Sequence, residues 1–243
     1  MLAASGIAVA APAKLVIGVV PSLGPAAAVL DQAFTKDHAE VEISVRVATA
    51  TALSTSASSS DAPDLLLLDS LDAAKALIAR SQALGDSLTP VGDGLLAIYT
   101  NTPGVNTGRG APLFVADYIT GIAVSDRQAS PFGQIARDVL ERLTLLELAE
   151  KKFRLFPDDA AAAAAVKAAE VDIGLIPVPL LVSAGYRNIG SSTALPLGLY
   201  TPAAYTAVIT RDSAAARAYL AFLQAKSTQP LLTDVGIVPA SIR

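Results

Sequence analysis

Val16-Ile17-Gly18-Val19-Val20-Pro21-Ser22-Leu23-Gly24 joins an apolar strand to the start of a helix through a turn of small residues. Two later stretches have the same order, one at residues 41–53 and one at residues 121–133. The first turn of a helix leaves backbone N–H groups without partners and carries a partial positive charge. Several helix starts aimed at one cleft would therefore form an anion site without lysine or arginine. This pattern favours a binding protein over a catalyst.

Predicted strands and helices alternate along the chain, which indicates an α/β fold with mostly parallel sheets flanked by helices. The predicted strands are 14–20, 41–47, 64–68, 95–100, 121–125, 153–156, 172–176 and 205–210. The predicted helices are 26–35, 71–80, 131–146, 158–169, 177–184, 213–224 and 229–235. The serine-rich segment 54–60 has poor helix propensity, so it is either a frayed helix or a surface loop.

Two loop-forming segments divide this pattern into two lobes with a cleft between them. Val91–Gly94 and Leu199–Ala204 are rich in glycine, proline or threonine, and each lies where an αβ unit ends. We expect the first lobe to combine residues 14–92 with 203–243, and the second lobe to span residues 93–202. Two crossings between the lobes would permit hinge closure over a ligand.

The composition is that of a globular protein and excludes several classes of function. The 243 residues are 52% hydrophobic and 16% charged, with a net charge of −4. Without a basic block, the chain is not expected to bind nucleic acid or an anionic membrane. There is no cysteine, which excludes disulfides and thiolate metal sites.

The first 13 residues are apolar and small, and Ala11-Pro12-Ala13 matches the small-x-small pattern of a signal-peptide cleavage site. The basic residues that normally open a signal peptide do not precede Leu2. Residues 1–13 are therefore either the remnant of a signal peptide or a frayed tail. We expect a periplasmic or extracytoplasmic location. No later stretch reaches the roughly 18 apolar residues of a membrane span.

Residues suited to catalysis or metal binding are scarce. The single histidine, His38, sits in a polar loop, and neither a Gly-x-Ser-x-Gly elbow nor a Walker phosphate loop occurs. Gly92-Asp93-Gly94 precedes a strand, so it does not fit a dinucleotide fingerprint. Asp158-Asp159 is interpreted as a helix cap, and Tyr200 and Tyr205 as hinge packing in preference to cleft residues. We expect no catalytic residue, no metal and no cofactor, and hence no enzyme.

Six short segments, taken in order, resemble those of a known family. They are Val20-Pro21-Ser22-Leu23, Ala48–Leu53, Asp61–Leu65, Pro131-Phe132-Gly133, Gly174–Pro177 and Val235–Pro239. The chain after Lys14 is similar to the periplasmic molybdate-binding proteins of ABC importers, which have the type II periplasmic binding protein fold. The resemblance implies an extracytoplasmic solute-binding protein that holds a tetrahedral oxyanion, such as molybdate or tungstate, between two lobes. It also implies a membrane permease as partner, and we expect a monomer.

The resemblance places the ligand-binding positions on both lobes. They are Ser22, Leu23, Thr49, Ala50, Thr51, Pro131, Phe132, Gly133, Asp159 and Pro177. One of these positions agrees with the family, and two differ from it. Ser22 keeps its donor side chain, Phe132 adds bulk where the family has a small residue, and Pro177 has lost both a tyrosine hydroxyl and an amide.

Asp159 conflicts with an anionic ligand. Two like charges about 4 Å apart cost roughly 4 kcal/mol at an effective dielectric near 20, which is about three decades of affinity. The carboxylate either points outward or folds onto its own helix start and takes the donors that an anion would use. In the second case the site suits a neutral, zwitterionic or cationic ligand. Arg127 is the nearest basic residue in sequence, and we expect it to be exposed in a loop.

Two alternatives to an oxyanion importer stay open at this point. The same fold could bind a different small organic or zwitterionic ligand, which the bulk of Phe132 and the proline at position 177 favour. The chain could also be a sensor or interaction domain that has no role in transport.

Overall fold

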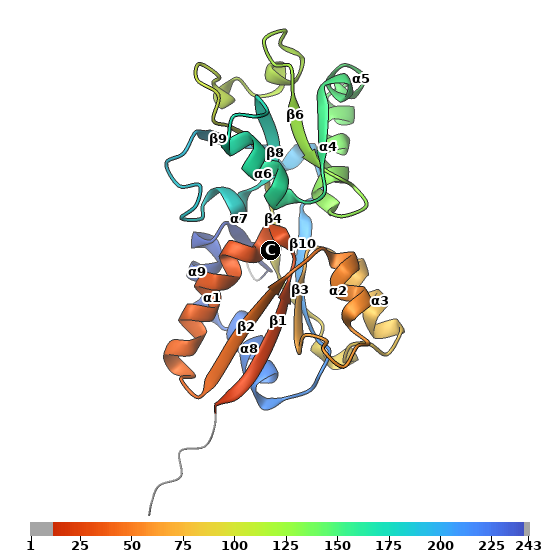
Figure 1. Ribbon diagram of the computed structural model, residues 1–243, viewed down its shortest axis with the longest axis vertical. Helices are drawn as coiled ribbons and strands as arrows, with labels where there is room; N and C mark the ends of the chain where they lie inside the picture. Colours follow the sequence, from red (N-terminus) through yellow and green to blue (C-terminus); the bar gives the residue numbers. More distant parts are fainter. Residues whose placement is uncertain (1–11, 241–243) are drawn as a thin grey trace, which may run out of the picture.

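The structure, a computed structural model, describes residues 12–240 and contains two β-sheets, each flanked by helices (Figure 1). The lower sheet in Figure 1 has the strand order β11-β4-β10-β3-β1-β2, and the upper sheet has the order β7-β6-β8-β5-β9. We call the parts built on these sheets the lower lobe and the upper lobe. The predicted two-lobed α/β fold is thereby confirmed.

The lower lobe contains the beginning and the end of the described chain. Its strands are β1 (Ala13–Val19), β2 (Val41–Val47), β3 (Leu65–Leu68), β4 (Thr89–Gly94), β10 (Ala203–Ile209) and β11 (Ile237–Pro239). Its helices are α1 (Gly24–Asp37), α2 (Ala50–Ser56), α3 (Leu71–Ala79), α8 (Ala214–Gln224) and α9 (Gln229–Asp234). Of the segment 1–13, interpreted as a signal-peptide remnant or a frayed tail, residues 1–11 lie outside the described residues, and Ala13 is the first residue of β1.

The upper lobe is formed by the middle of the chain. Its strands are β5 (Leu96–Thr100), β6 (Ile122–Ser125), β7 (Phe153–Phe156), β8 (Ile173–Pro177) and β9 (Ser191–Ala194). Its helices are α4 (Pro131–Arg142), α5 (Leu146–Ala149), α6 (Asp159–Lys167) and α7 (Val178–Leu181). Among residues 12–240, no helix combines the length and the apolar character that a membrane crossing requires.

The sheets are mixed, so the expectation of mostly parallel sheets is wrong. Strand β1 runs parallel to β2 and β3, and β6 runs parallel to β7 and β8. The pairs β10–β3, β10–β4, β11–β4, β5–β8 and β5–β9 are antiparallel. The reason is the crossing between lobes: β4 ends at Gly94 and β5 begins at Leu96, so one extended segment enters both sheets. The crossing sets the direction of β4 and β5, so these strands run antiparallel to their neighbours, whereas strands joined through a helix run parallel.

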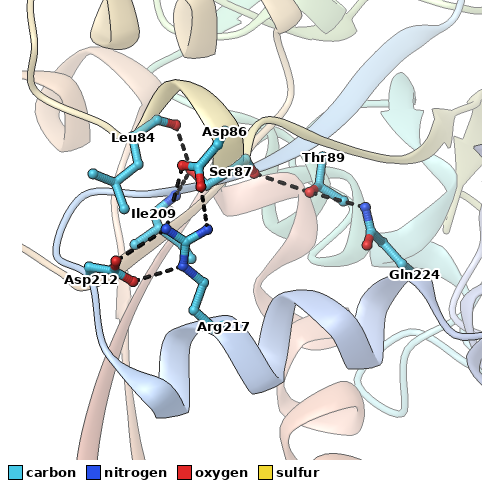
Figure 2. A network of polar contacts seen from close by, with 8 residues as sticks. All are labelled: Leu84, Asp86, Ser87, Thr89, Ile209, Asp212, Arg217 and Gln224. Atoms are coloured by element: carbon cyan, nitrogen blue, oxygen red, sulfur yellow. Dashed lines mark hydrogen bonds and ion pairs between the residues drawn. The ribbon is translucent and has the colours of Figure 1, made fainter.

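Both crossings are held by specific contacts. The Tyr200 hydroxyl accepts a hydrogen bond from the Leu96 amide at 2.9 Å and thus joins the second crossing to the first. This is the packing role expected of Tyr200. Figure 2 shows a polar network within the lower lobe, at the end of β10 away from the crossings: Arg217 on α8 pairs with Asp212 at 2.8 Å and with Asp86 at 2.9 Å.

Local sequence explains most helix starts. Ser213 caps α8 by accepting a hydrogen bond from the Ala216 amide at 3.1 Å, and Ser130 caps α4 in the same manner. The helix predicted at 131–146 is divided into α4 and α5 at Thr144, whose φ of 58° lies in the left-handed region. Helix α2 occupies part of the serine-rich segment, which resolves the open choice there in favour of a short helix.

Candidate functional site

Six buried polar residues come together where the two lobes face each other. Short 3-10 turn η1 (Pro21–Leu23), which follows β1, lies against α6 and α7 of the upper lobe. All six side chains belong to residues that are at most 4% exposed. We call this set the inter-lobe cluster, and its members are Ser22, Asp69, Ser125, Ser130, Asp159 and Tyr205.

Asp159 belongs to the first turn of α6, but it does not cap the helix. Asp158 is the cap, because its Oδ1 accepts a hydrogen bond from the Ala161 amide at 2.8 Å. Asp159 instead accepts hydrogen bonds from the hydroxyls of Ser125, at the end of β6, and of Ser130, at the start of α4, the latter at 2.8 Å. Both predicted orientations are therefore wrong: the carboxylate neither points outward nor folds onto its own helix start.

The environment of Asp159 favours the protonated form. Burial raises the pKa of Asp159 to about 6. The hydrogen bonds from the two serine hydroxyls lower the pKa, but they do not cancel the effect of burial. The charge of Asp158 raises it further. Asp159 thus takes two hydroxyl donors that an anionic ligand would need.

Asp69 is a second buried carboxylate in the cluster, and sequence reasoning missed it. It follows β3 directly, and its Oδ1 is buried without a hydrogen-bond partner among the described residues. Burial raises the pKa of Asp69 to about 7, and the charge of Asp159 contributes to the increase. A signal was available, because an acid that directly follows four consecutive leucines lies at the carboxyl end of a buried strand, where ligands bind in α/β folds.

Tyr205 on β10 lies next to Asp69, because Thr206 pairs with Leu68 in the antiparallel β10–β3 ladder. Burial raises the pKa of Tyr205 well above its usual value, Ser22 lowers it, and the charges of Asp69 and Asp159 raise it. Neither the Tyr205 hydroxyl nor the Ser22 hydroxyl has a hydrogen-bond partner of good geometry in the described chain. The ring of Phe132 packs against that of Tyr205, with centroids 6.2 Å apart. The predicted preference for hinge packing therefore describes Tyr200 better than Tyr205.

Three amides that were expected to face a ligand already have acceptors. The Leu23 amide donates to the Val20 carbonyl at 3.0 Å. The amides of Phe132 and Gly133 donate to the Ser130 hydroxyl and carbonyl at 3.2 and 3.3 Å. The expectation of open helix-start amides is wrong at these positions, because local capping satisfies them.

Steric crowding explains why position 133 is a glycine. A Cβ there would lie 2.2 Å from the Ser125 carbonyl oxygen, so α4 can approach the end of β6 only with glycine at this position. Pro131 opens α4 and has no N–H to offer.

The remaining predicted site residues have other surroundings. Thr49 caps α2, accepting a hydrogen bond from the Ala52 amide at 3.3 Å. Ala50 and Thr51 line a groove of about 500 Å³ between α2 and α3. Pro177 is buried at the end of β8, where it pairs with Leu96. No described hydrogen bond joins these four residues to the inter-lobe cluster.

The two carboxyl groups of the cluster have no basic partner among the described residues. Within residues 12–240, no lysine, arginine or histidine forms an ion pair with Asp69 or Asp159. Arg127 is exposed, as expected. The described residues also contain no group of three or more histidine, cysteine, aspartate or glutamate side chains that could hold a metal ion.

Comparisons with solved structures show the same two-lobed fold in proteins with unlike ligands. The chain superimposes on the periplasmic molybdate-binding protein of Azotobacter vinelandii with a TM-score of 0.82 and 19% identity, over 92% of this chain and 98% of that chain. It superimposes on the sulfate-binding protein SubI of Mycobacterium tuberculosis with a TM-score of 0.72 and 11% identity, over 94% and 87% of the two chains. A periplasmic thiamin binding protein gives a TM-score of 0.66 and 16% identity, over 94% and 83%.

Sequence comparison identifies the family. No curated protein matches the chain. The family model described as bacterial extracellular solute-binding protein matches residues 15–238, which is nearly the whole chain. The fold and this match together establish that the protein belongs to the family of bacterial extracellular solute-binding proteins.

Proposed function

We propose that the protein is the solute-binding component of an ABC importer, and that it holds a small polar solute at the inter-lobe cluster and presents it to a membrane permease. The observation that carries this proposal is the set of buried, unpartnered polar atoms where the lobes meet: Ser22 Oγ, Asp69 Oδ1 and the Tyr205 hydroxyl. Each such atom costs roughly 1–3 kcal/mol when it lacks a partner. A bound solute that supplied the missing hydrogen bonds would remove this cost.

The geometry favours a small organic solute with hydrogen-bond donors or positive charge. Ionised Asp69 and Asp159 can only accept hydrogen bonds, and they repel anions. No described basic side chain offsets them.

An oxyanion such as molybdate or tungstate is the second candidate ligand. It is favoured by the likeness to molybdate- and sulfate-binding proteins and by the hydroxyls of Ser22, Ser125, Ser130 and Tyr205, each a potential donor. Because the pKa values of Asp159 and Asp69 are about 6 and 7, we expect oxyanion binding to strengthen as the pH falls through this range.

Access to the cluster requires the lobes to separate. Asp69 and Asp159 are 2% and 1% exposed, so a solute cannot reach them in the described arrangement. We propose that the crossing at Leu95 and the segment between β9 and β10 act as the hinge. Binding then involves closure over the solute and no covalent chemistry.

A thermal-shift panel tests the proposal. Ligand at 100 times its dissociation constant stabilises the folded protein by about 2.7 kcal/mol, which raises the melting temperature by roughly 5–11 °C in a chain of this size. The panel contains molybdate, tungstate, sulfate and phosphate together with amino acids, polyamines and sugars, each at pH 5 and pH 8. A shift with one chemical class supports solute capture. Silence across all classes at both pH values contradicts it and favours a sensor or interaction domain.

A further inference from the structure

We infer that the inter-lobe cluster recognises an ammonium group of the solute and that Asp69 is the anionic partner of this group. The inference rests on the proposed function, since it names the chemical class of solute that the same site takes. Three features of the cluster carry it: the number of free acceptors, their arrangement around Tyr205, and the sign of the charge.

The number of free acceptors matches an ammonium group. A primary ammonium has three N–H donors and no acceptor. The cluster offers three buried oxygens without a hydrogen bond of good geometry in the described chain, namely Asp69 Oδ1, Ser22 Oγ and the Tyr205 hydroxyl. These residues are 2%, 0% and 1% exposed, so water in the closed arrangement does not solvate them freely.

The three residues lie at the same end of neighbouring strands. Strands β1 and β3 are parallel neighbours, so Ser22, in the turn after β1, and Asp69, directly after β3, follow the carboxyl ends of adjacent strands. Thr206 pairs with Leu68 in the antiparallel β10–β3 ladder, which places Tyr205 next to Asp69. The effect of Ser22 and Asp69 on the pKa of Tyr205 agrees with this arrangement.

The sign of the charge separates an ammonium from other ligand groups. An anion cannot bond to ionised Asp69, and a neutral alcohol leaves its charge uncompensated. Calcium takes six to eight oxygen ligands, commonly several carboxylates, whereas the described residues contain no acidic group of three at one site. An ammonium both pairs with Asp69 and donates to the two hydroxyls.

The two carboxylates have different parts in this arrangement. Asp159 accepts hydrogen bonds from Ser125 and Ser130, which hold it in place. The Oδ1 of Asp69 has no such partner and is left for a ligand. Asp69 is thus the direct contact, and Asp159 strengthens the negative potential beside it.

Isothermal titration calorimetry tests the inference on the full chain. The probes are a series of primary amines from methylammonium to spermidine, the alcohols of matched length, and sodium molybdate, all at pH 6.5. Each is titrated in two buffers of different ionisation enthalpy, which gives the number of protons exchanged on binding. The titratable groups that face one another here are Asp69, Asp159 and Tyr205, with Asp158 beside Asp159.

The sign of proton exchange distinguishes the ligand classes. An ammonium favours the ionised carboxylates, so we expect an amine to bind and release protons. An oxyanion favours the protonated carboxylates and would take protons up. Asp69→Asn should weaken amine binding by about 10- to 100-fold, because a hydrogen bond to a charged group contributes about this factor to the affinity. Asp117→Asn, at an exposed site, is the matched control and should change nothing.

Failure of the inference differs from failure of the proposed function. Binding of molybdate or of alcohols but not of amines overturns the ammonium assignment and leaves solute capture intact. Amine binding that Asp69→Asn does not weaken, or that occurs with proton uptake, also overturns it. If no probe of any class binds or shifts the melting temperature, the proposed function itself is contradicted.

Discussion

Replacing Asp69 with asparagine should stabilise the protein at alkaline pH. The carboxyl has a pKa of about 7 in the folded protein and 3.8 as a model group, because burial and the charge of Asp159 oppose its ionisation. The folded state therefore binds this proton more tightly than the unfolded state. The free energy of unfolding decreases as the pH rises from about 4 to about 7, and above that range the whole contribution has been lost.

The size of the effect follows from the pKa difference. A difference of about three units corresponds to roughly 4 kcal/mol at 1.36 kcal/mol per unit. Asparagine does not ionise, so Asp69→Asn should recover up to this amount at pH 8 and very little at pH 4. In a chain of this length the melting temperature at pH 8 should rise by roughly 8–16 °C.

Urea denaturation followed by circular dichroism measures this effect directly. Unfolding curves of the natural protein, Asp69→Asn and the control Asp117→Asn are recorded at pH 4, 6 and 8. The stability difference between Asp69→Asn and the natural protein should grow with pH, while the exposed control should stay within about 0.5 kcal/mol. Equal stability of Asp69→Asn and the natural protein at pH 8, or a gain of the same size at pH 4, would refute the assignment of a buried, ionisable Asp69.

Two further substitutions test other buried carboxylates. Tyr219→Phe removes a hydroxyl that donates to Asp31 Oδ1 at 2.6 Å. Because a buried acceptor is then left unpaired, the free energy of unfolding measured with urea should fall by about 1–3 kcal/mol. Unchanged stability would argue against that bond. Ser130→Ala removes both the cap of α4 and a donor to Asp159, so it should cost about 1–2 kcal/mol and raise the pKa of Asp159 above about 6 in a carboxyl NMR titration. Ser213→Ala, which removes the cap of α8, is its control and should lower stability without moving that pKa.

We expect the two-lobed scaffold to tolerate changes in the residues that line the face between its lobes. The apolar strands of the sheets, such as β3, are buried in the core of their lobe. The residue that directly follows β3 is an acid, Asp69. At the inter-lobe cluster, where we propose that the solute binds, the buried polar groups include two carboxylates. Fold similarity at 11–19% identity is therefore compatible with a changed ligand class.

The local pattern of the sequence determined much of the secondary structure. Strands β2 and β7 have the predicted bounds, 41–47 and 153–156, and α8 begins directly after its cap at Ser213. Alternating apolar residues and capping side chains act within a few residues, so they can be read without knowing the rest of the chain. The strands β4, β9 and β11 were not predicted, because their sequences are ordinary loop sequences that become strands only by pairing with distant segments.

The sequence by itself also determined the two-lobed class, the absence of cysteine chemistry and the conflict between Asp159 and an anion. Only the tertiary structure decided where that carboxylate points, since its partners Ser125 and Ser130 are 34 and 29 residues away. It also decided that Asp69, directly after β3, lies next to Tyr205 on β10, and that the charge of Asp159 acts on both. Burial and electrostatic neighbours depend on contacts between segments that are far apart in sequence, and these contacts exist only once both lobes have folded and met.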